Sequence, residues 1–298
     1  MQDHSFHIIR AEQWSKEEWN NRIEELNYLG LYCRYEYLQH FCDDWICISN
    51  PNRTLLLPVP IRKKMGITYV YTPSFFPQTS IIGKYNEDDI ASLTNKLLSI
   101  VHFGDLFLQG VLLSNKKIRQ TLKTNFTLDT SNWKNKIIDH HRRALEKANK
   151  QDFNIQEQVE AHVIIDLFKE VYTEKMPHVT DNDYNRLLQW CEQQTNTIQT
   201  YCVYLHGEIH AAAILFCHRN TLYNIINVVT EAGKVSRANY SLYGYILDRC
   251  HIQHLNLDWE GSDIPGIARF YEGWGSEKHN YYHYHINALP FPLNYFKR

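Results

Sequence analysis

The order of expected secondary-structure elements in the first half of this chain occurs again in the second half. In each half, hydrophobic periodicity and turn residues predict a strand, two helices, three strands, a helix, a strand, a short helix and a final strand. The segments of the first half are Phe6–Arg10, a helix from Ser15, Tyr35–Phe41, Trp45–Ser49, Thr54–Pro60, Ile67–Thr72, Glu87–Val101, Leu106–Leu113, Asn115–Lys123 and Phe126–Asp129. Those of the second half are Phe153–Gln156, Ala161–Lys175, Asp181–Cys191 with Asp181 as N-cap, Thr200–Leu205, Ile209–Cys217, Leu222–Val229, Ala238–His251, His254–Trp259, Ile264–Trp274 and Tyr281–Ile286. A repeated order of this length predicts two domains of one architecture.

Three strands joined by short turns, followed by a strand–helix–strand unit, predict a mixed sheet with helices on its faces. The fold class is therefore α/β, with two similar domains at residues 1–131 and 132–298. The segment 133–150 is expected to connect them as a basic helix, and no Gly/Ser-rich linker separates them.

Charge and cysteine content narrow the class of function. The chain has 31 basic and 33 acidic residues and a net charge of −2, which argues against a DNA-binding protein. Its seven cysteines form no CxxC pair, so we expect free thiols in a reducing compartment. No apolar leader and no run of 18 apolar residues occur, so we expect a cytoplasmic protein without a membrane span.

Three stretches resemble the FemAB family, bacterial transferases with two GNAT-like domains. Residues 71–78 read YTPSFFPQ, similar to the family's aromatic-TP turn after the three strands. Residues 141–148 read HRRALEKA, similar to its R-R-x-x-x-K-A segment between domains. Residues 257–275 read LDWEGSDIPGIARFYEGWG, similar to its strand–EGS–helix–aromatic–Gly signature, the most specific of the three. The resemblance implies tandem GNAT-like domains.

The resemblance also implies a reaction in which an amine attacks an activated carbonyl, carried by acyl-CoA or aminoacyl-tRNA. Known family members build peptidoglycan cross-bridges, so a nucleotide-linked or lipid-linked cell-wall precursor is one expected partner. Members that use tRNA often carry a long helical hairpin in the second domain. Here only the short segment Asp181–Gln194 occupies that place, which disfavours tRNA.

Acidic residues cluster where the strand before the EGS signature ends. Because ligands of α/β sheets bind outside the carboxyl ends of strands, Asp258 and Glu260 are candidate catalytic groups for accepting the proton of an amine. Strand alternation would point both side chains to one face. Tyr271 is a candidate proton donor to the leaving group. The alternative is that Glu260 forms a structural ion pair with Arg269 or Lys278.

The segment before Ala238 is a candidate site for the phosphates of the donor. The start of a helix offers free N–H groups and a positive dipole end to an anion. The residues expected to bind there are Gly233, Lys234, Ser236, Arg237 and Asn239. Their spacing differs from the usual GNAT pyrophosphate loop, and the alternative is an ordinary capped helix start.

Two further groups are candidates for binding the acceptor. Arg142, Arg143 and Lys147 in the connecting helix offer charge to acidic groups, although such a run is also typical of a solvated helix face. Tyr71 and Phe75 of the aromatic-TP turn offer an apolar wall.

The sequence leaves two functions open. One is an acyl- or aminoacyltransferase acting on an amine; the other is a degenerate tandem protein that binds a saccharide or peptide precursor without turnover. His279, His283 and His285 lack the spacing of a zinc finger, and we expect no metal.

Overall fold

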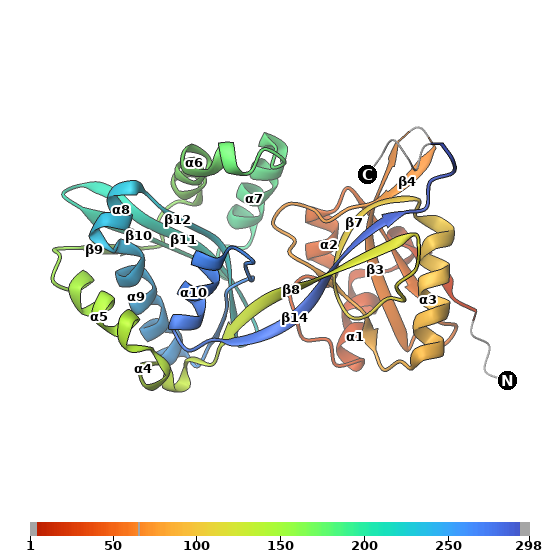
Figure 1. The fold of residues 1–298 in the computed structure, drawn as a ribbon, viewed down its shortest axis with the longest axis horizontal. Coiled ribbons are helices and arrows are strands. Elements are labelled where there is room, and N and C mark those ends of the chain that lie inside the picture. Colours follow the sequence, from red (N-terminus) through yellow and green to blue (C-terminus); the bar gives the residue numbers. More distant parts are fainter. Residues whose placement is uncertain (1–4, 65, 293–298) are drawn as a thin grey trace. The chain divides into compact units, whose positions relative to one another are not determined.

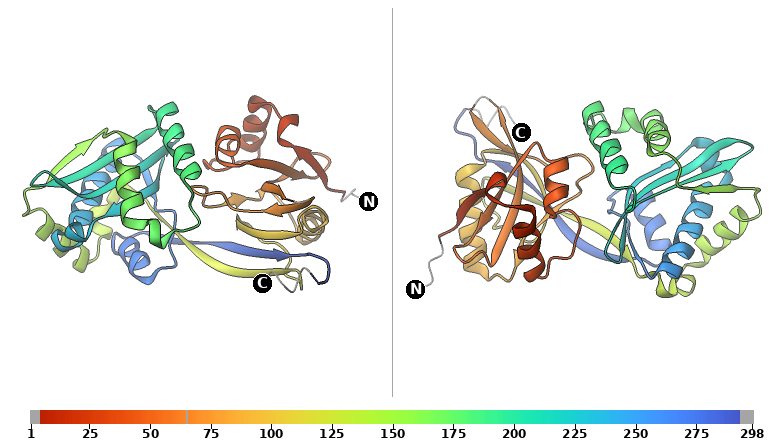
Figure 2. Two further views of the ribbon diagram at one scale, coloured as in Figure 1. Left: turned by 90° about the horizontal axis from the view of Figure 1, so that it is seen from above. Right: turned by 180° about the vertical axis from the view of Figure 1, so that it is seen from behind.

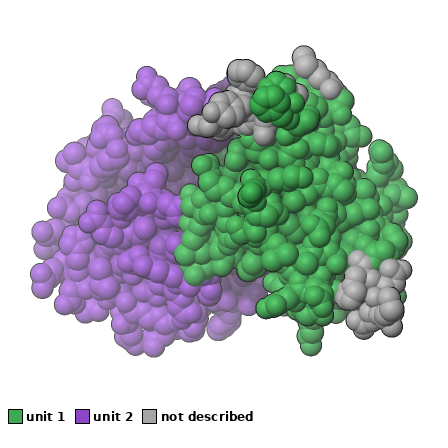
Figure 3. Space-filling view, turned by 45° about the vertical axis from the view of Figure 1, so that its right-hand side comes forward, with its two compact units in different colours: residues 1–123, 280–298 green, residues 124–279 purple. Residues whose placement is uncertain are grey.

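The computed structural model describes residues 5–64 and 66–292, which form two compact units. Unit 1 comprises Met1–Lys123 and Asn280–Arg298, and unit 2 comprises Thr124–His279 (Figure 3). The sequence predicted a domain boundary after residue 131, and two segments of the chain belong to a different unit than that boundary implies. Residues 124–131 belong to unit 2, and the last strand of the chain ends in unit 1.

Among its described residues, unit 1 contains two α-helices before its three-strand meander and one after it (Figure 1). Its elements are β1 (His7–Arg10), α1 (Lys16–Glu25), α2 (Tyr35–Phe41), β2 (Asp44–Ser49), β3 (Leu55–Lys64), β4 (Ile67–Val70), β5 (Thr79–Ser80), β6 (Ile82–Gly83), α3 (Glu87–Ile100), β7 (Phe103–Gln109) and the first part of β8 (Ile118–Leu128). Strands β1 to β4 pair in antiparallel order, and β7 pairs parallel with β4. Its core packs apolar residues of β2, β3 and β7 against those of α3.

Unit 2 repeats the order, and the three strands of its meander are longer than those of unit 1. Its elements are α4 (Trp133–Lys136), α5 (Asp139–Ala148), β9 (Asn154–Glu157), α6 (Ala161–Tyr172), α7 (Asp181–Gln193), β10 (Ile198–Leu205), β11 (Glu208–His218), β12 (Thr221–Val229), α8 (Glu231–Ser236), α9 (Ala238–Gln253), β13 (Asn256–Asp258), α10 (Pro265–Gly273) and the start of β14 (Glu277–Asn287). Helices α6 and α7 lie on one face of the sheet and α5, α9 and α10 on the other (Figures 1 and 2). Both predicted three-strand meanders are confirmed.

Each half of the chain gives its last strand to the other unit. The end of β8 pairs with β13 in unit 2, with Leu128 opposite Leu257 and Thr127 opposite Asp258. The end of β14 pairs with β7 in unit 1, from Tyr282 opposite Leu108 onward. This exchange is why the compact units and the consecutive sequence halves differ.

Several local expectations were wrong. The segment 115–123 was expected as a helix, but its residues 118–123 form the first part of β8. Thr180, not Asp181, is the N-cap of α7: its hydroxyl accepts from the N–H of Asp183, whose carboxylate bonds back in a capping box.

The connecting segment 133–150 lies wholly within unit 2 as α4 and α5. Helix α5 buries His141, Ala144 and Ala148, and it packs against α9. Within the described residues, no helix is long and apolar enough to cross a membrane.

Candidate functional site

Strands β12 and β13 run parallel for three residue pairs and then diverge. The last pair is Tyr223 with Asp258. Beyond it β12 continues on β11 as far as Val229, whereas the backbone N–H of Trp259 donates to the Phe126 carbonyl on β8, 2.9 Å away. We refer to the region between Asn224 and Glu260, where the strands part, as the β12–β13 fork. It lies at the carboxyl ends of two parallel strands, where sheets of this class bind ligands.

Glu260 carries the most unusual group at the fork. Although the residue as a whole keeps some exposure, its Oε1 atom is enclosed and has no hydrogen-bond partner among the described residues. Burial raises the pKa of this carboxyl well above the ordinary range of glutamate. The rival ion pairs do not form: Lys278 pairs with Glu272 at 2.7 Å, and Arg269 donates to the Pro265 carbonyl. An enclosed, unpaired carboxyl is costly and therefore typical of a functional group.

Tyr271 on α10 is a neighbour of Glu260. Its ring stacks on Trp259 with centroids 4.6 Å apart, and burial raises the pKa of its phenol. The negative charge of Glu260 raises that pKa further, which places the two groups within electrostatic reach. The phenol therefore stays protonated and can act as a proton donor.

The Asp258 carboxylate, unlike that of Glu260, accepts two hydrogen bonds. Its Oδ1 accepts from Asn125 Nδ2 at 2.9 Å and from the Glu260 backbone N–H at 3.0 Å. Burial raises the pKa of Asp258, while these hydrogen bonds oppose the rise. Strand β13 ends at Asp258 and Glu260 has a φ of 66°, so the expected strand alternation does not extend to Glu260. This arrangement suits Asp258 to holding the turn.

Two more polar residues, neither of them among the candidates above, are associated with the fork. Asn224 is buried in β12 and accepts at 2.7 Å from the Tyr243 hydroxyl of α9. Tyr172, the last residue of α6, contributes electrostatically to the raised pKa values of both Tyr243 and Tyr271. An asparagine in the middle of an apolar strand was the available signal, because a buried amide needs a partner.

The expected phosphate loop is instead a short helix, α8, followed directly by α9. Four of the five candidate side chains or backbone groups already have protein partners there. Gly233 N–H donates to Thr230, Lys234 pairs with Glu231, Ser236 lies 2.9 Å from His210, and Asn239 accepts from Asn227. Arg237 is exposed at the start of α9, with a φ of 62°. Helix α9 has no side-chain cap and no acidic residue in its first turn, so it suits an anion.

A pocket of about 670 Å³ lies beside the first turn of α9. It is formed between α9, α10 and the start of α5, and is lined by Ile138, His140, His141, Tyr240, Gly266, Arg269, Phe270, Glu272 and Gly273. Burial lowers the pKa of His141 to about 4, so at neutral pH this ring is uncharged. Aromatic rings beside Arg269 and a helix start suit the planar base of a nucleotide.

The acceptor candidates do not come together within one unit. Arg142, Arg143 and Lys147 lie on the exposed face of α5 in unit 2, where Arg142 is 3.6 Å from Asp139. Tyr71 and Phe75 lie in unit 1 and serve its packing. Arg62 stacks on the Tyr71 ring at 3.8 Å, and the Phe75 carbonyl accepts from Tyr37.

The C-terminal histidines have protein partners. His283 Nε2 and His285 Nδ1 lie 2.8 and 3.0 Å from Asp105 Oδ1, and His279 contacts Thr127. The first two hydrogen bonds lower the pKa of Asp105. Across the described ranges, no group of three or more His, Cys, Asp or Glu is arranged to hold a metal ion.

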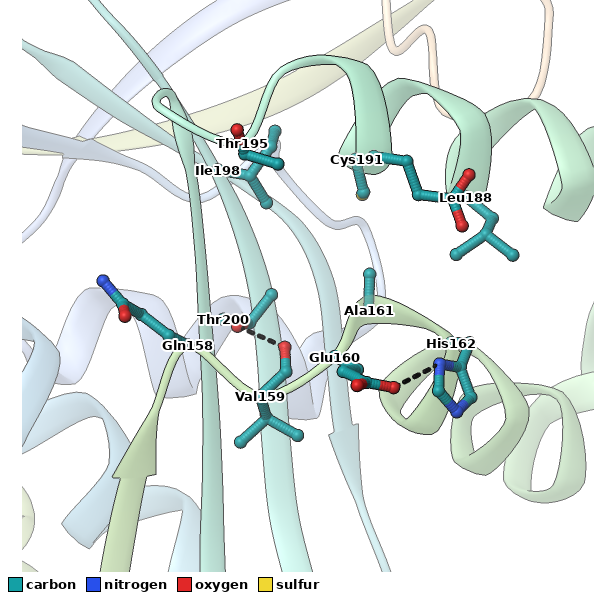
Figure 4. A pocket seen from close by; sticks show the side chains of 11 residues that line it. Gln158, Val159, Glu160, Ala161, His162, Leu188, Cys191, Thr195, Ile198 and Thr200 are labelled. Atoms are coloured by element: carbon teal, nitrogen blue, oxygen red, sulfur yellow. Dashed lines mark hydrogen bonds and ion pairs between the residues drawn. The ribbon is translucent and has the colours of Figure 1, made fainter.

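A second pocket, of about 510 Å³, lies between α6, α7 and β10 (Figure 4). Glu160 and His162 form an ion pair of 3.2 Å at its edge, and Thr200 donates to the Val159 carbonyl. None of the fork residues lines it.

These features define a class. The fold is that of tandem GNAT proteins, and residues 134–258 match the family model described as acetyltransferase (GNAT) domain. The chain thus has a FemAB-like fold of the GNAT superfamily, which supports acyl or aminoacyl transfer as the kind of reaction.

Solved structures agree on the fold over nearly the whole chain. FemX superposes with a TM-score of 0.62 at 10% identity, covering 98% of this chain and 99% of FemX. A tandem GNAT protein from the clavulanic acid biosynthesis pathway gives 0.54 at 8% identity, with 96% and 99% covered. The C-terminal domain of a putative lysylphosphatidylglycerol synthetase from Agrobacterium fabrum gives 0.52 at 10%, with 95% of each covered. Comparison with curated proteins finds no sequence match.

Proposed function

We propose that this protein is an N-acyltransferase whose unit 2 binds acyl-CoA and transfers the acyl group to the amine of a small molecule or cell-wall precursor. The observation that carries the proposal is the enclosed, unpaired carboxyl of Glu260 at the β12–β13 fork. A neutral amine loses a proton as it forms the amide, and a carboxylate with a raised pKa is a stronger base than an ordinary one.

The groups at the fork can balance the reaction. The amine nitrogen bonds to the thioester carbon and the C–S bond breaks. The proton lost by nitrogen passes to ionised Glu260, and the protonated phenol of Tyr271 can supply a proton to the departing sulfur. Because Glu260 must be ionised to accept a proton, turnover should rise with pH through its raised pKa.

The start of α9 supports an acyl-CoA donor. Its first N–H groups and Arg237 offer two sources of positive potential for a pyrophosphate. The neighbouring pocket of about 670 Å³ has Tyr240 and Arg269 in its lining for the nucleotide end. A tRNA donor stays disfavoured because α6 and α7 are short helices of 12 and 13 residues.

The proposed acceptor and setting follow from the family resemblance and from the thiols. Peptidoglycan precursors are the acceptors of known FemAB members, so an amine on such a nucleotide-linked or lipid-linked precursor is the first to test. The seven cysteines are free, which suits a reaction in the cytoplasm.

One observation favours the alternative of binding without turnover. Lys234, Ser236 and Asn239 are engaged within the protein, so the helix start lacks a complete phosphate-binding loop. A free-thiol assay with acetyl-CoA and a panel of amines, run beside calorimetry with CoA, separates the two. A transferase releases CoA thiol in an amine-dependent way. Precursor binding without CoA binding or thiol release would contradict the proposal.

A further inference from the structure

We propose that Asn125, on the strand contributed by the first half of the chain, is a positioning residue that holds the Glu260 carboxyl at the fork. This inference rests on the proposed function and adds a residue that acts through Asp258. The Asn125 side chain is buried, with 7% of the residue exposed. A buried amide needs hydrogen-bond partners, so the contacts of Asn125 show what it does at the fork.

The turn from Asp258 to Gly261 is an unfavourable backbone conformation that needs outside support. Glu260 and Gly261 are consecutive residues with φ of 66° and 75°, a left-handed region that a glutamate seldom adopts. Within the turn, Asp258 Oδ1 accepts from the Glu260 N–H at 3.0 Å. The direction of the Glu260 side chain therefore depends on where the Asp258 carboxylate is held.

Asn125 holds that carboxylate. Its own Oδ1 accepts from the Phe126 N–H at 2.8 Å, which orients the amide so that Nδ2 donates to Asp258 Oδ1 at 2.9 Å. The same Asp258 oxygen therefore links Asn125 to the backbone of Glu260.

The backbone of β8 supports the turn from the other side. A Cβ atom on Gly261 would lie 2.4 Å from the Thr124 carbonyl oxygen and 3.0 Å from Asn125 Cα. Glycine at this position lets the turn approach β8 closely. Strand β8 therefore shapes the fork both through a side chain and through close backbone contact.

One consequence concerns the tandem arrangement. Thr127 and Leu128 pair with β13, yet they precede the second sequence half at residues 132–298. Proper placement of the fork carboxyl therefore depends on a strand of the first half.

The test compares full-length Asn125→Ala with Thr127→Val, a control two residues along the same strand that removes the 2.7 Å contact with His279. A misplaced catalytic group costs about 10²-fold in rate, so Asn125→Ala should lose kcat by that order while the Kd for CoA stays within twofold. Thr127→Val should keep both values. Asn125→Ser retains a hydrogen-bond donor and should recover part of the lost kcat. If Asn125→Ala fails to fold, Asn125→Ser is used in its place.

Titration of the Glu260 carboxyl by carbon-13 NMR gives a readout that needs no activity. If Asn125 positions the group, the pKa measured for Glu260 falls toward the ordinary glutamate range in the Asn125 variant and stays raised in Thr127→Val. An unchanged Glu260 pKa together with wild-type kcat would overturn the positioning role. Full activity in Glu260→Gln, or absence of CoA binding in the wild-type chain, would instead contradict the proposed function.

Discussion

Each unit has a fork where two parallel strands of its sheet part, and the two forks differ in what lies along the strand edge. In unit 1 the fork is formed by β4 and β7, whose parallel pairing ends at Val70 and Gly104. The segment that follows β4 then runs along the freed edge of β7. Thr72 Oγ1 accepts from the Phe107 N–H at 3.1 Å, and β5 pairs parallel with Leu108 and Gln109. In unit 2 the corresponding pairing ends at Tyr223 and Asp258, and an enclosed carboxyl follows. One fork is sealed by protein, and the other presents a polar group that has no partner in the part of the chain that the structure describes.

The helices that follow these forks differ in the same sense. Helix α3 of unit 1 begins at Asn86 with a capping box, and its first turn carries Glu87, Asp88 and Asp89. Helix α9 of unit 2 begins at Arg237 without a side-chain cap and has no acid in its first turn. An anion is repelled at the first start and attracted at the second. This difference between the two helix starts supports the proposal that unit 2, and not unit 1, binds the phosphates of the donor.

Replacing the fork carboxyl should have the largest effect. Glu260→Gln keeps the shape of the side chain and removes its basicity, so kcat should fall by about 10² to 10⁴ while the Kd for CoA is unchanged. Steady-state kinetics and calorimetry measure both. Thr127→Val, on the neighbouring strand, is the control and should retain kcat. Survival of turnover in Glu260→Gln would remove the distinction between the two forks.

Gly104→Ala tests whether the unit 1 fork is purely structural. Gly104 has a φ of 131°, and a Cβ atom there would lie 1.8 Å from the Val70 carbonyl oxygen. Backbone strain and overpacking together should lower the free energy of unfolding by about 3 kcal/mol or more, measured with denaturant. Gly207→Ala, with open surroundings, is the control for strain alone. In the fraction that folds, CoA affinity should match wild type; a selective loss of affinity would place the donor in unit 1.

The pH dependence of stability should report the buried acid. The folded-state pKa of Glu260 is raised, so unfolding releases a proton at pH values above about 4.3, the ordinary pKa of glutamate. Relative to Glu260→Gln, the wild-type protein should lose about 1.4 kcal/mol per pH unit above that value, until the folded-state pKa is passed. Urea unfolding of both proteins at several pH values measures this difference in unfolding free energy. A difference that does not change with pH would mean that the Glu260 carboxyl is solvated.

Arg237→Glu should weaken donor binding specifically. Losing a charge-assisted contact at the start of α9 should cost about 1–3 kcal/mol in the calorimetric affinity for CoA. Arg219→Glu reverses another arginine of unit 2 with positive φ, at the β11–β12 turn, and serves as the control. Equal affinities in the two variants would move the phosphates away from α9.

The smallest effect should come from removing the contact between Thr72 and Phe107 that closes the unit 1 fork. Thr72→Val removes the side-chain acceptor of the Phe107 N–H and should lower stability by about 1 kcal/mol without changing kcat. Thermal unfolding and the free-thiol assay together check this. A change in kcat with normal stability would give this contact a role in catalysis.

Sequence patterns predicted the architecture well because it depends on local periodicity. The helix Tyr35–Phe41 and both meanders follow directly from apolar spacing and turn residues. The exchange of final strands could not be predicted in this way. The segment 115–123 has weak alternation, and its state as part of β8 depends on pairing with distant strands.

The candidate site was partly accessible from sequence. Glu260 was found because a strand end followed by acidic residues suggests a ligand site, and Tyr271 because the chain resembles GNAT enzymes; the structure brings these two together. The five-residue phosphate site was not realised as a loop, because Thr230 caps α8 through the Gly233 N–H. The support from Asn125 was invisible, since it crosses 133 residues of sequence and depends on a left-handed turn.

The central claim is that the acyl donor binds in unit 2, at the fork that carries Glu260. A crystal structure of the full chain with acetyl-CoA tests it most directly. We predict one donor per chain, with its phosphates at Arg237 and the first turn of α9, and with its thioester between Asn224 and Glu260. Acetyl-CoA bound along β7 in unit 1, or clear density away from both Arg237 and Glu260, would contradict the account.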